Sequence, residues 1–595
     1  MIRHALDLGF GATLLGPERT RFRLWAPGQA AVSLVIEGRE PLPMRPGEDG
    51  WFEIEAACGA GTLYRYRLAD GLEVPDPASR FQPRDVHGPS EVIDPRAYAW
   101  RNTAWRGRPW EETVIYELHA GLLGGFAGVA DKLPALAELG ITAVQLMPIA
   151  DFPGERNWGY DGVLPYAPDS AYGTPEALKA LVDRAHDLGL QIFLDVVYNH
   201  FGPDGNYVPV MAPEFFRDDL HTPWGGAIDF RRPQVRDYFT RNVLYWLTEY
   251  RFDGLRFDAV HAIPEADWLD EMAAAARRAV EPGRHVHFIL ENEHNDAPIL
   301  ARDIDAQWND DVHHCLHVML TDDHHGYYGN YVRDTAGKLA RAMREGFVYQ
   351  GEPPETGVGK PRGTPSAGLP PTAFVDCLQN HDQVGNRAIG ERLTVLADHD
   401  ALRAAIGLLL ISPHIPMIFM GEEAGATEPF LFFTSHGEEL AVLVREGRRK
   451  EFAAFPEFAD PEHRERIPDP NAVSTFEASR PRIAGDPEPE GHDARDAWTD
   501  FYGRLLAFRH RAIVPRLSGA RAEDAVPLGQ RGVLARWRMG DGARLTLAMN
   551  LAEVAETAPA GWIKAGPPAF LIGAAPDGRD AVPPRTMWAW IERDE

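Results

Sequence analysis

Hydrophobic and polar residues alternate through most of the first 95 positions of the chain. Phe22, Leu24 and Ala26 form one such run, and turns rich in Gly and Pro separate the runs from one another. A period of two places every second side chain on the same face of a strand, so that one face can be buried. We therefore predict an immunoglobulin-like β-sandwich over residues 1–95. The irregular, Trp-rich segment that follows predicts a linker over residues 96–112.

At residue 113 apolar runs of strand length begin to alternate with amphipathic helical segments such as PEALKALVDRAHDLG. Eight of these runs have the composition of buried strands: VIYELHA (114–120), ITAVQLMPI (141–149), QIFLDVV (191–197), GLRFDAV (254–260), HFILENE (287–293), AQWND (306–310), AFVDCLQ (373–379) and PMIFMGE (416–422). Eight βα repeats predict the α/β class and a (β/α)8 TIM barrel, here over residues 113–517. A Pro- and Gly-rich stretch at residues 198–233 predicts a small subdomain inserted over the cleft.

The last part of the chain returns to alternation. Val533, Ala535 and Trp537 share one face, and the Gly540-Asp541-Gly542 sequence that follows is typical of a turn between two strands. We expect a C-terminal β-sandwich over residues 518–595. A chain of 595 residues is also too long for one compact core, which agrees with several domains.

Charge and cysteine usage narrow the classes of partner. The formal net charge of −28 would repel phosphate backbones and anionic lipids, so we expect neither nucleic acid nor membrane as a partner. Cys58, Cys315 and Cys377 are an odd number without CxxC spacing, which favours a reducing compartment. The beginning of the sequence has no basic stretch followed by an apolar core, and Pro413 and Pro416 interrupt the longest apolar stretch. We therefore expect a cytoplasmic protein.

Clusters of polar residues follow four of the predicted barrel strands. They are Asp195 to His200, Arg256 to Asp258, Glu291 to Glu293 and Asn380 to Asp382. Barrel enzymes place their working residues at the carboxyl ends of the strands, where the loops meet at one mouth. The sequence thus predicts a single site rich in carboxylates.

Residue types and spacing suggest glycosidic bond cleavage at this site. Arg256 and Asp258 lie two residues apart on a strand, so the guanidinium can keep the carboxylate ionised as a nucleophile. Glu291, on the next strand and near that anion, is expected to have a raised pKa and to donate a proton to the leaving oxygen. Asp382 is placed to hold sugar hydroxyls in the transition state. Glu293, two residues after Glu291 and on the same face by spacing, is the rival for the acid role.

The four clusters read FLDVVYNH, GLRFDAVHA, FILENEHND and QNHDQVGN, and in this order they resemble the α-amylase family of glycoside hydrolases. The resemblance runs through the whole barrel. It implies Asp258 as nucleophile, Glu291 as general acid/base and Asp382 as transition-state stabiliser. It also implies that further side chains bind the sugar under attack, namely Arg256, His200, His381 and, as an aromatic platform, Tyr160. In the same pattern Asp195 is an internal brace.

The sequences NWGYDGVLPYAP and VVYNHFGPDGNY, with the N-terminal sandwich, resemble family members that release trehalose. This likeness implies hydrolysis of the α-1,4 bond next to the terminal trehalose of maltooligosyl trehalose or a related α-glucan, after a synthase has made that substrate. Candidate walls for the trehalose unit are the loops after the fourth, fifth and sixth strands, including His261, Glu293, His294, Asn309 and Asp310. A glucan branching transferase and a non-catalytic glucan-binding protein are the alternatives. Whether the N-terminal sandwich binds glucan or braces the barrel stays open.

Two histidine-rich sequences, DDVHHCLH (310–317) and DDHH (322–325), contain residue types that bind metals. We expect a solvated loop or a cleft wall there instead. The mechanism above requires neither a metal nor a cofactor, and we expect none.

Overall fold

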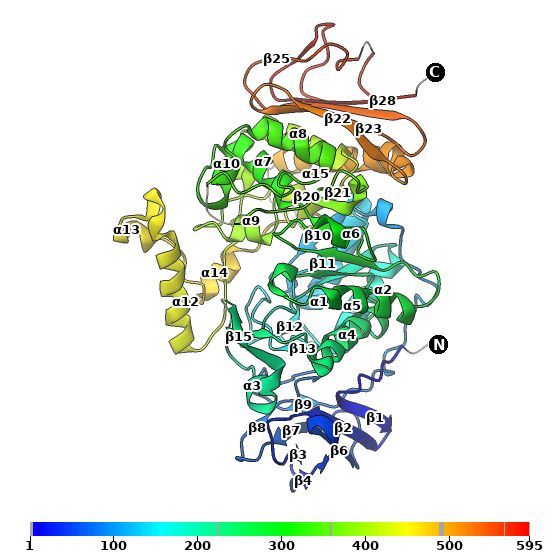
Figure 1. Cartoon of the computed structure of the whole chain (residues 1–595), viewed down its shortest axis with the longest axis vertical. Coiled ribbons are helices and arrows are strands. Elements are labelled where there is room, and N and C mark those ends of the chain that lie inside the picture. The colour runs from blue at the N-terminus through cyan, green and yellow to red at the C-terminus, as the bar shows by residue number, and fades with distance from the viewer. Residues whose placement is uncertain (1–3, 223–224, 357–359, 487–492, 565, 594–595) are drawn as a thin grey trace.

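The computed structural model describes residues 4–222, 225–356, 360–486, 493–564 and 566–593. Along the long axis of the molecule lie the N-terminal sheets, a central barrel and the C-terminal sheets, in that order (Figure 1). The predicted fold class is confirmed, because eight parallel strands close into a barrel in the order β10-β11-β14-β17-β18-β19-β20-β21.

Two antiparallel sheets form the N-terminal sandwich. One contains β1 (Gly11–Gly16), β2 (Arg19–Trp25), β6 (Trp51–Ala56) and β5 (Arg45–Pro46), and the other β4 (Leu42–Pro43), β3 (Ser33–Ile36), β7 (Leu63–Arg67) and β8 (Glu73–Val74), with β9 (Ser90–Glu91) paired to β7. The alternating residues of the sequence face a shared core that includes Phe22, Leu34 and Tyr66. Burial of one face of each strand therefore explains why this part of the chain folds as two layers.

The segment predicted as a linker packs against the amino-terminal ends of the barrel strands. Trp105 donates its Nε1–H to Asp253 Oδ1 at 2.8 Å, and Trp110 donates to the carbonyl oxygen of Thr372 at 2.7 Å. Trp100 is buried as well. These indole rings cover the end of the barrel that lies opposite the predicted site.

Each barrel strand lies inside one of the eight predicted runs, except that β21 begins one residue earlier. The strands are β10 (Ile115–Leu118), β11 (Ala143–Leu146), β14 (Gln191–Val196), β17 (Gly254–Phe257), β18 (His287–Leu290), β19 (Ala306–Trp308), β20 (Phe374–Cys377) and β21 (Ile415–Phe419). Every strand residue is buried, as expected when helices cover a parallel sheet.

The main helices that cover the barrel are α1 (Gly125–Leu139), α2 (Pro175–Asp187), α4 (Pro233–Thr248), α5 (Asp267–Ala279), α7 (Asp310–Thr321), α8 (Thr335–Glu345), α11 (His399–Ile411) and α15 (Asp493–Phe508). Shorter helices are α6 (Ala297–Leu300), α9 (His381–Gly385) and α10 (Leu393–Leu396). Local signals start several of them: Thr174 accepts a hydrogen bond from Ala177 N at 3.2 Å, and proline follows it at the first position of α2.

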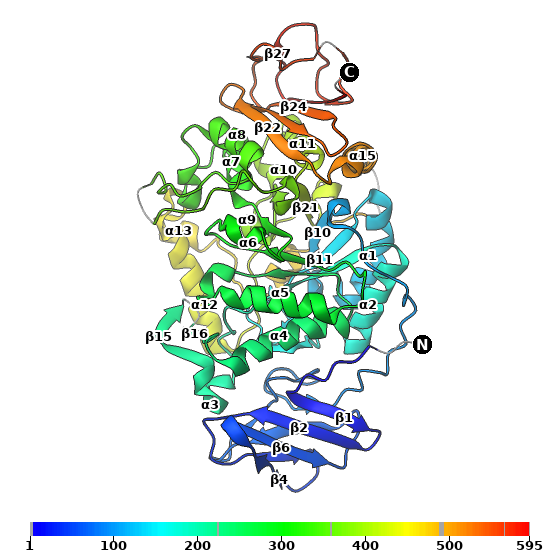
Figure 2. The same cartoon turned by 45° about the vertical axis from the view of Figure 1, so that its right-hand side comes forward.

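Two excursions leave the barrel. After β14 come α3 (Val208–Met211) and the hairpin of β15 (Phe216–Thr222) and β16 (Gly225–Ile228), within the stretch predicted as an insertion. A second excursion, which the sequence analysis did not single out, contains α12 (Glu438–Glu451), α13 (Pro461–Arg464) and α14 (Val473–Ala478). It projects from the same flank of the barrel as the hairpin in both views (Figures 1 and 2). A smaller hairpin of β12 (Ala150–Asp151) and β13 (Leu164–Pro168) follows β11.

The C-terminal region contains a five-stranded sheet in the order β22 (Arg521–Pro527), β23 (Gly532–Arg538), β24 (Arg544–Asn550), β28 (Thr586–Glu592) and β26 (Phe570–Ile572). A two-stranded sheet of β25 (Glu556–Thr557) and β27 (Ala581–Val582) lies with it. The expected turn connects β23 and β24, and Gly542 has a φ of 84°, which a residue without Cβ adopts readily. The large sheet packs on α8 and α11 of the barrel.

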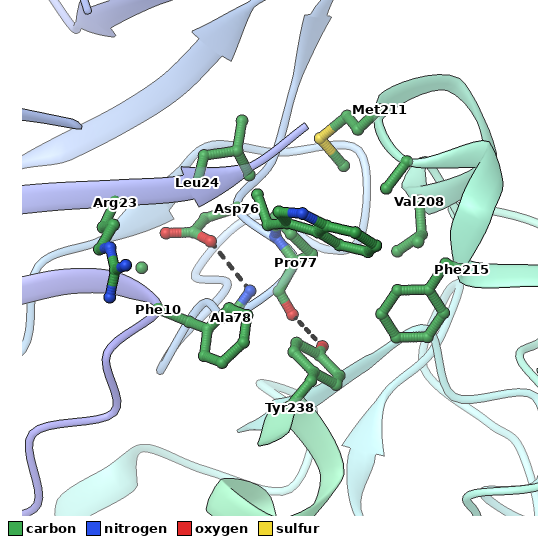
Figure 3. A pocket seen from close by; sticks show the side chains of 13 residues that line it. Phe10, Arg23, Leu24, Asp76, Pro77, Ala78, Val208, Met211, Phe215 and Tyr238 are labelled. Atoms are coloured by element: carbon green, nitrogen blue, oxygen red, sulfur yellow. Dashed lines mark hydrogen bonds between the residues drawn. The ribbon is translucent and has the colours of Figure 1, made fainter. Parts of the chain in front are cut away.

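The sandwich and the barrel meet along an apolar seam (Figure 3). Phe10 and Pro77 face Val208 and Phe215 across a small pocket, and Tyr238 donates its hydroxyl proton to the carbonyl oxygen of Pro77 at 2.5 Å. Apart from Arg23 and Asp76 the lining is mostly hydrophobic, which suits packing between domains better than the binding of a polar sugar. These contacts support a bracing role for the sandwich.

A solvated loop or a cleft wall was expected over residues 310–317, and the solvated loop is wrong. These residues lie in α7, where His313, His314 and His317 are buried against the ring of Tyr328. The apolar residues between the histidines supply a helical stripe that packs inward. Within the described ranges, no three His, Cys, Asp or Glu side chains are grouped so as to hold a metal ion. Nor does any described helix have the length and apolarity to cross a membrane.

Candidate active site

The four predicted clusters meet at one mouth of the barrel. Asp195 lies in β14, Arg256 in β17, and Glu291 directly follows β18. Asp195 pairs in register with Arg256, and Phe257 with Leu290. Parallel strands in register bring their carboxyl ends together, so the side chains that follow them converge. Asp382 joins them from the first turn of α9, after β20.

Arg256 is the centre of the site and is 0% exposed. Its Nη1 lies 2.8 Å from Asp195 Oδ2 and 2.7 Å from Asp258 Oδ1, and its Nη2 lies 3.4 Å from Glu291 Oε2. The guanidinium carbon also lies 4.1 Å from the centre of the Trp308 ring. One cation therefore holds three carboxyl groups in fixed positions, with an aromatic face beneath it.

Asp258 has both carboxylate oxygens oriented. Arg256 donates to Oδ1, and Asn199 Nδ2 donates to Oδ2 at 2.8 Å. The side chain is still 13% exposed, so it faces the open mouth. A carboxylate that is held in place and reachable has the geometry of a glycosyl nucleophile.

Glu291 lies beside Asp258, and its side chain is 19% exposed. Its Oε2 accepts a hydrogen bond from Ala259 N at 2.6 Å. Burial raises the pKa of the Glu291 carboxyl to about 8, although Arg256 opposes the shift. The nearby charges of Asp258 and Asp382 contribute to this raised value. Glu291 is thus protonated at neutral pH, as a general acid must be.

Glu293 differs sharply from Glu291. Its side chain is 67% exposed, and the imidazole of His261 lies nearby, with Nε2 3.9 Å from Oε2. The expectation that both glutamates share one face is wrong, because β18 ends at Leu290 and the chain turns afterwards. The two-residue rule holds only within a strand. Glu293 and His261 therefore lie together at the rim of the mouth.

Asp382 is positioned by a helix cap. Asn380 precedes α9 and accepts a hydrogen bond from Gln383 N at 2.8 Å, which fixes the first turn. The Asp382 side chain is 39% exposed, and its Oδ2 lies 3.3 Å from His381 Nε2. It is the most accessible of the three predicted catalytic carboxylates.

Three residues expected to bind sugar contact one another on the floor of the mouth. The Tyr160 ring stacks on His381 with centroids 5.0 Å apart, and its hydroxyl donates to Asp195 Oδ2 at 2.7 Å. His200 is nearly buried, with Nε2 2.9 Å from the carbonyl oxygen of Tyr160. Asp195 is the brace that the motif implied, since it joins Tyr160 to Arg256.

Asn309 and Asp310 lie at the start of α7 but differ in surroundings. Asn309 is 2% exposed, and its amide donates to Gly346 O and to Asp376 Oδ1, each at 3.1 Å. The expected position of Asn309 in a cleft wall is not observed, because its amide nitrogen forms hydrogen bonds inside the barrel. Asp310 is partly exposed, and burial raises the pKa of its carboxyl to about 6.

The sequence analysis missed three residues that touch this network: Glu117, Asn199 and Trp308. Glu117 accepts from His381, Asn199 orients Asp258, and Trp308 underlies Arg256. A signal for Glu117 was available, because a charged residue inside an apolar strand is costly to bury without a partner.

Comparison with known families agrees with this geometry. Residues 81–211 match the family described as alpha amylase, catalytic domain, and residues 520–586 match a domain family of unknown function. The closed barrel, the carboxylates at its mouth and this match together define a glycoside hydrolase of the α-amylase family.

Relatives of known name narrow the class. The chain is 43% identical over 478 residues to a malto-oligosyltrehalose trehalohydrolase of Deinococcus radiodurans, which covers 78% of each protein. It is 41% identical over 454 residues to a protein of the same name from Saccharolobus solfataricus, covering 73% of this chain and 79% of the relative. The chain belongs to the malto-oligosyltrehalose trehalohydrolase family.

Two further similarities complete the comparison. A crystal structure of a Salmonella typhimurium protein, provisionally described as an alpha amylase, superposes with a TM-score of 0.90 at 42% identity and covers 98% of this chain and 99% of its own. A 1,4-alpha-glucan branching enzyme of Burkholderia thailandensis is 32% identical over 322 residues but covers only 48% of this chain and 38% of the relative.

Proposed function

We propose that this protein hydrolyses the α-1,4-glucosidic bond next to the terminal trehalose unit of maltooligosyl trehalose. The products are trehalose and a shortened maltooligosaccharide. One observation carries the chemistry: Arg256 fixes Asp258 and Glu291 side by side, with one oriented and the other carrying a raised pKa. The name shared by the relatives supports the substrate.

In the proposed mechanism Asp258 attacks the anomeric carbon while Glu291 protonates the leaving oxygen. Asp382 holds hydroxyls of the sugar ring as it flattens toward an oxocarbenium ion. Glu291 then takes a proton from water, which displaces Asp258 from the glycosyl-enzyme. Two displacements at one carbon retain its configuration.

The leaving group distinguishes this substrate from ordinary maltooligosaccharides. A trehalose end has an α,α-1,1 linkage and no reducing group, so a wall shaped to it can gain contacts that a maltose end does not offer. We propose that His261, Glu293 and Asp310 contribute to this wall, since all three are partly or fully exposed around Glu291 and Asp382. Contacts made in the transition state raise the rate as well as the affinity.

The test compares maltooligosyl trehalose with a maltooligosaccharide of equal length. We expect kcat/KM to be higher for the former by at least about tenfold, or about 1.4 kcal/mol. Trehalose is detected by chromatography and the anomeric configuration of the new reducing end by NMR. Equal rates on the two substrates would contradict the trehalose assignment, and an inverted product would contradict the mechanism.

A branching transferase is the second candidate, supported by the partial match to a branching enzyme. It would use the same carboxylates and pass the glycosyl group to a sugar hydroxyl instead of water. New α-1,6 branches in amylose without release of trehalose would favour it.

We further propose that the protein acts in the cytoplasm, after a synthase that makes maltooligosyl trehalose. We also propose that its domains divide near residues 95, 112 and 517.

A further inference from the structure

Glu117 is a buried carboxylate with no role in the mechanism above. It lies in β10, is 0% exposed and faces His381 of α9. Its Oε1 lies 2.7 Å from His381 Nδ1, and its Oε2 accepts from the backbone N of His381 at 3.0 Å. Both oxygens are therefore engaged by one residue, whose Nε2 lies 3.3 Å from Oδ2 of the catalytic carboxylate Asp382.

The hydrogen bonds around His381 determine its protonation. Nδ1 faces a carboxylate oxygen, which can only accept, so Nδ1 carries a proton. Nε2 lies 2.7 Å from the hydroxyl oxygen of Tyr160. That hydroxyl has one proton and donates it to Asp195 Oδ2 at 2.7 Å, so its oxygen must accept from Nε2. Both ring nitrogens donate, which makes the ring an imidazolium.

We propose that Glu117 is a positioning residue of the active site: it keeps His381 in the imidazolium form, with the Nε2 proton directed at Tyr160 and Asp382. Glu117 does not touch the substrate and acts through His381. Its importance for catalysis rests on the proposed function, whereas the charge state of His381 can be measured without any substrate.

The charges that face His381 come from several elements. Glu117 of β10, Asp195 of β14 and Asp382 of α9 are carboxylates, and Arg256 of β17 is the nearest cation. His119, at the end of β10, is close enough for the two imidazoles to interact, and burial lowers the pKa of His119 to about 4, which leaves that ring neutral. Tyr160 contacts Nε2 directly.

The balance of these groups favours the charged ring. Burial alone would lower the pKa of His381, but Asp382 and Glu117 raise it to about 9, while Arg256 opposes them. An imidazolium at this point offsets part of the repulsion among the carboxylates of the site and offers a charged N–H donor beside Asp382. Without the Glu117 charge, the ring would lose its proton at a lower pH.

The first test is the pH profile of kcat for Glu117→Gln, which keeps the shape of the side chain and removes its charge. In the parent protein the alkaline limb reflects Glu291, whose pKa is about 8. In the variant we expect this limb to move down by at least about one pH unit, because His381 now deprotonates first, with kcat at pH 7 reduced about twofold or more. KM should change little. A uniform loss of kcat with an unmoved limb would overturn the proposal.

Glu423→Gln is the matched control. Glu423 is also buried, accepts from Tyr116 at 3.0 Å and from Ala484 N at 2.7 Å, and contacts none of the catalytic residues in these bonds. We expect its loss to lower stability without moving the alkaline limb. A shift of similar size in both variants would show a general effect of removing a buried charge and would overturn a special role for Glu117.

The second test uses NMR of the whole protein with 13C-labelled histidine, where the His381 signal is the one absent from His381→Gln. We expect that signal to titrate above about pH 8 in the parent and about two units lower in Glu117→Gln. If Glu117→Gln does not fold, the parent titration alone decides: a His381 pKa at or below about 6.5 would overturn the proposal.

A double mutant removes any remaining ambiguity. In a His381→Gln background, Glu117→Gln should no longer move the pH profile, because the group through which it acts is gone. A further shift in that background would contradict the proposal. Failure of the parent to release trehalose would count against the proposed function only, since the titration of His381 is read without substrate.

Discussion

Strand β17 has a buried aspartate immediately before it and a partly buried one immediately after it, and the two differ in every respect that matters for function. Asp253 is fully buried and accepts from His186 Nε2 at 2.9 Å, Trp105 Nε1 at 2.8 Å and Ile192 N at 3.1 Å. Asp258, at the other end, is held by Arg256 and Asn199 and faces the open mouth.

The pKa values of the carboxyl groups at the two ends of β17 depend on how many hydrogen-bond donors and cations each group has. Burial would raise the pKa of Asp253, but His186 and the other donors lower it overall. At the mouth, burial raises the pKa of Asp195 to about 6 and of Glu291 to about 8. Arg256 lowers both pKa values but does not cancel the effect of burial, because this one cation is shared among several carboxyl groups. A carboxylate whose oxygens have a full set of hydrogen-bond donors stabilises the fold. Carboxylates that compete for one cation can instead exchange protons with the substrate.

The largest effect is expected for Asp258→Asn, which removes the nucleophile at the mouth. We expect kcat to fall by at least about 10⁴-fold, the order of loss when a covalent catalyst is removed. Stability should stay the same or rise, because the substitution relieves charge repulsion with Asp195. Steady-state rates and the melting temperature measure the two effects. A variant that kept more than about a hundredth of the activity would contradict the assignment of the nucleophile.

A smaller loss is expected for Glu291→Gln. Removal of a positioned general acid should lower kcat by about 10² to 10⁴. In the parent, activity should fall as pH rises through about 8, where Glu291 loses its proton, and the variant should lack this limb. The comparison is Glu293→Gln, which should lower kcat much less than Glu291→Gln, because the Glu293 side chain is 67% exposed at the rim of the mouth. A reversed ranking of the two variants would reassign the acid to Glu293.

Asp253→Asn should have no effect on chemistry and a clear effect on stability. Loss of one member of a buried ion pair costs about 3 kcal/mol of unfolding free energy. Because the pKa of Asp253 is lowered by folding, this contribution is present above the unfolded pKa and is lost as pH falls through the folded value. Urea denaturation at pH 7 should therefore separate variant from parent, and the gap should narrow in acid. A tenfold loss of kcat at unchanged stability would contradict the assignment of a stabilising role to Asp253 and a catalytic role to Asp258.

Features that depend on residues close together in the sequence could be predicted. Features that depend on contacts between distant parts of the chain could not. The strands of the barrel follow from continuous apolar runs, and Asp258 and Arg256 meet because a strand places residues i and i+2 on one side. The same rule failed for Glu293, where the strand had already ended. The buried helix α7 was missed because its histidines are polar by composition and are buried only through packing against Tyr328.

By itself, the sequence determined the order of the layers, the eight strands and the four polar clusters, since each is encoded in residues that lie close together along the chain. Only the tertiary structure decided that Arg256 is shared among Asp195, Asp258 and Glu291, and that Glu117 meets His381 across 264 residues. The physical reason is closure of the barrel. Pairing of β10 with β21 brings the first strand beside the last, and no local pattern specifies which side chains then face one another.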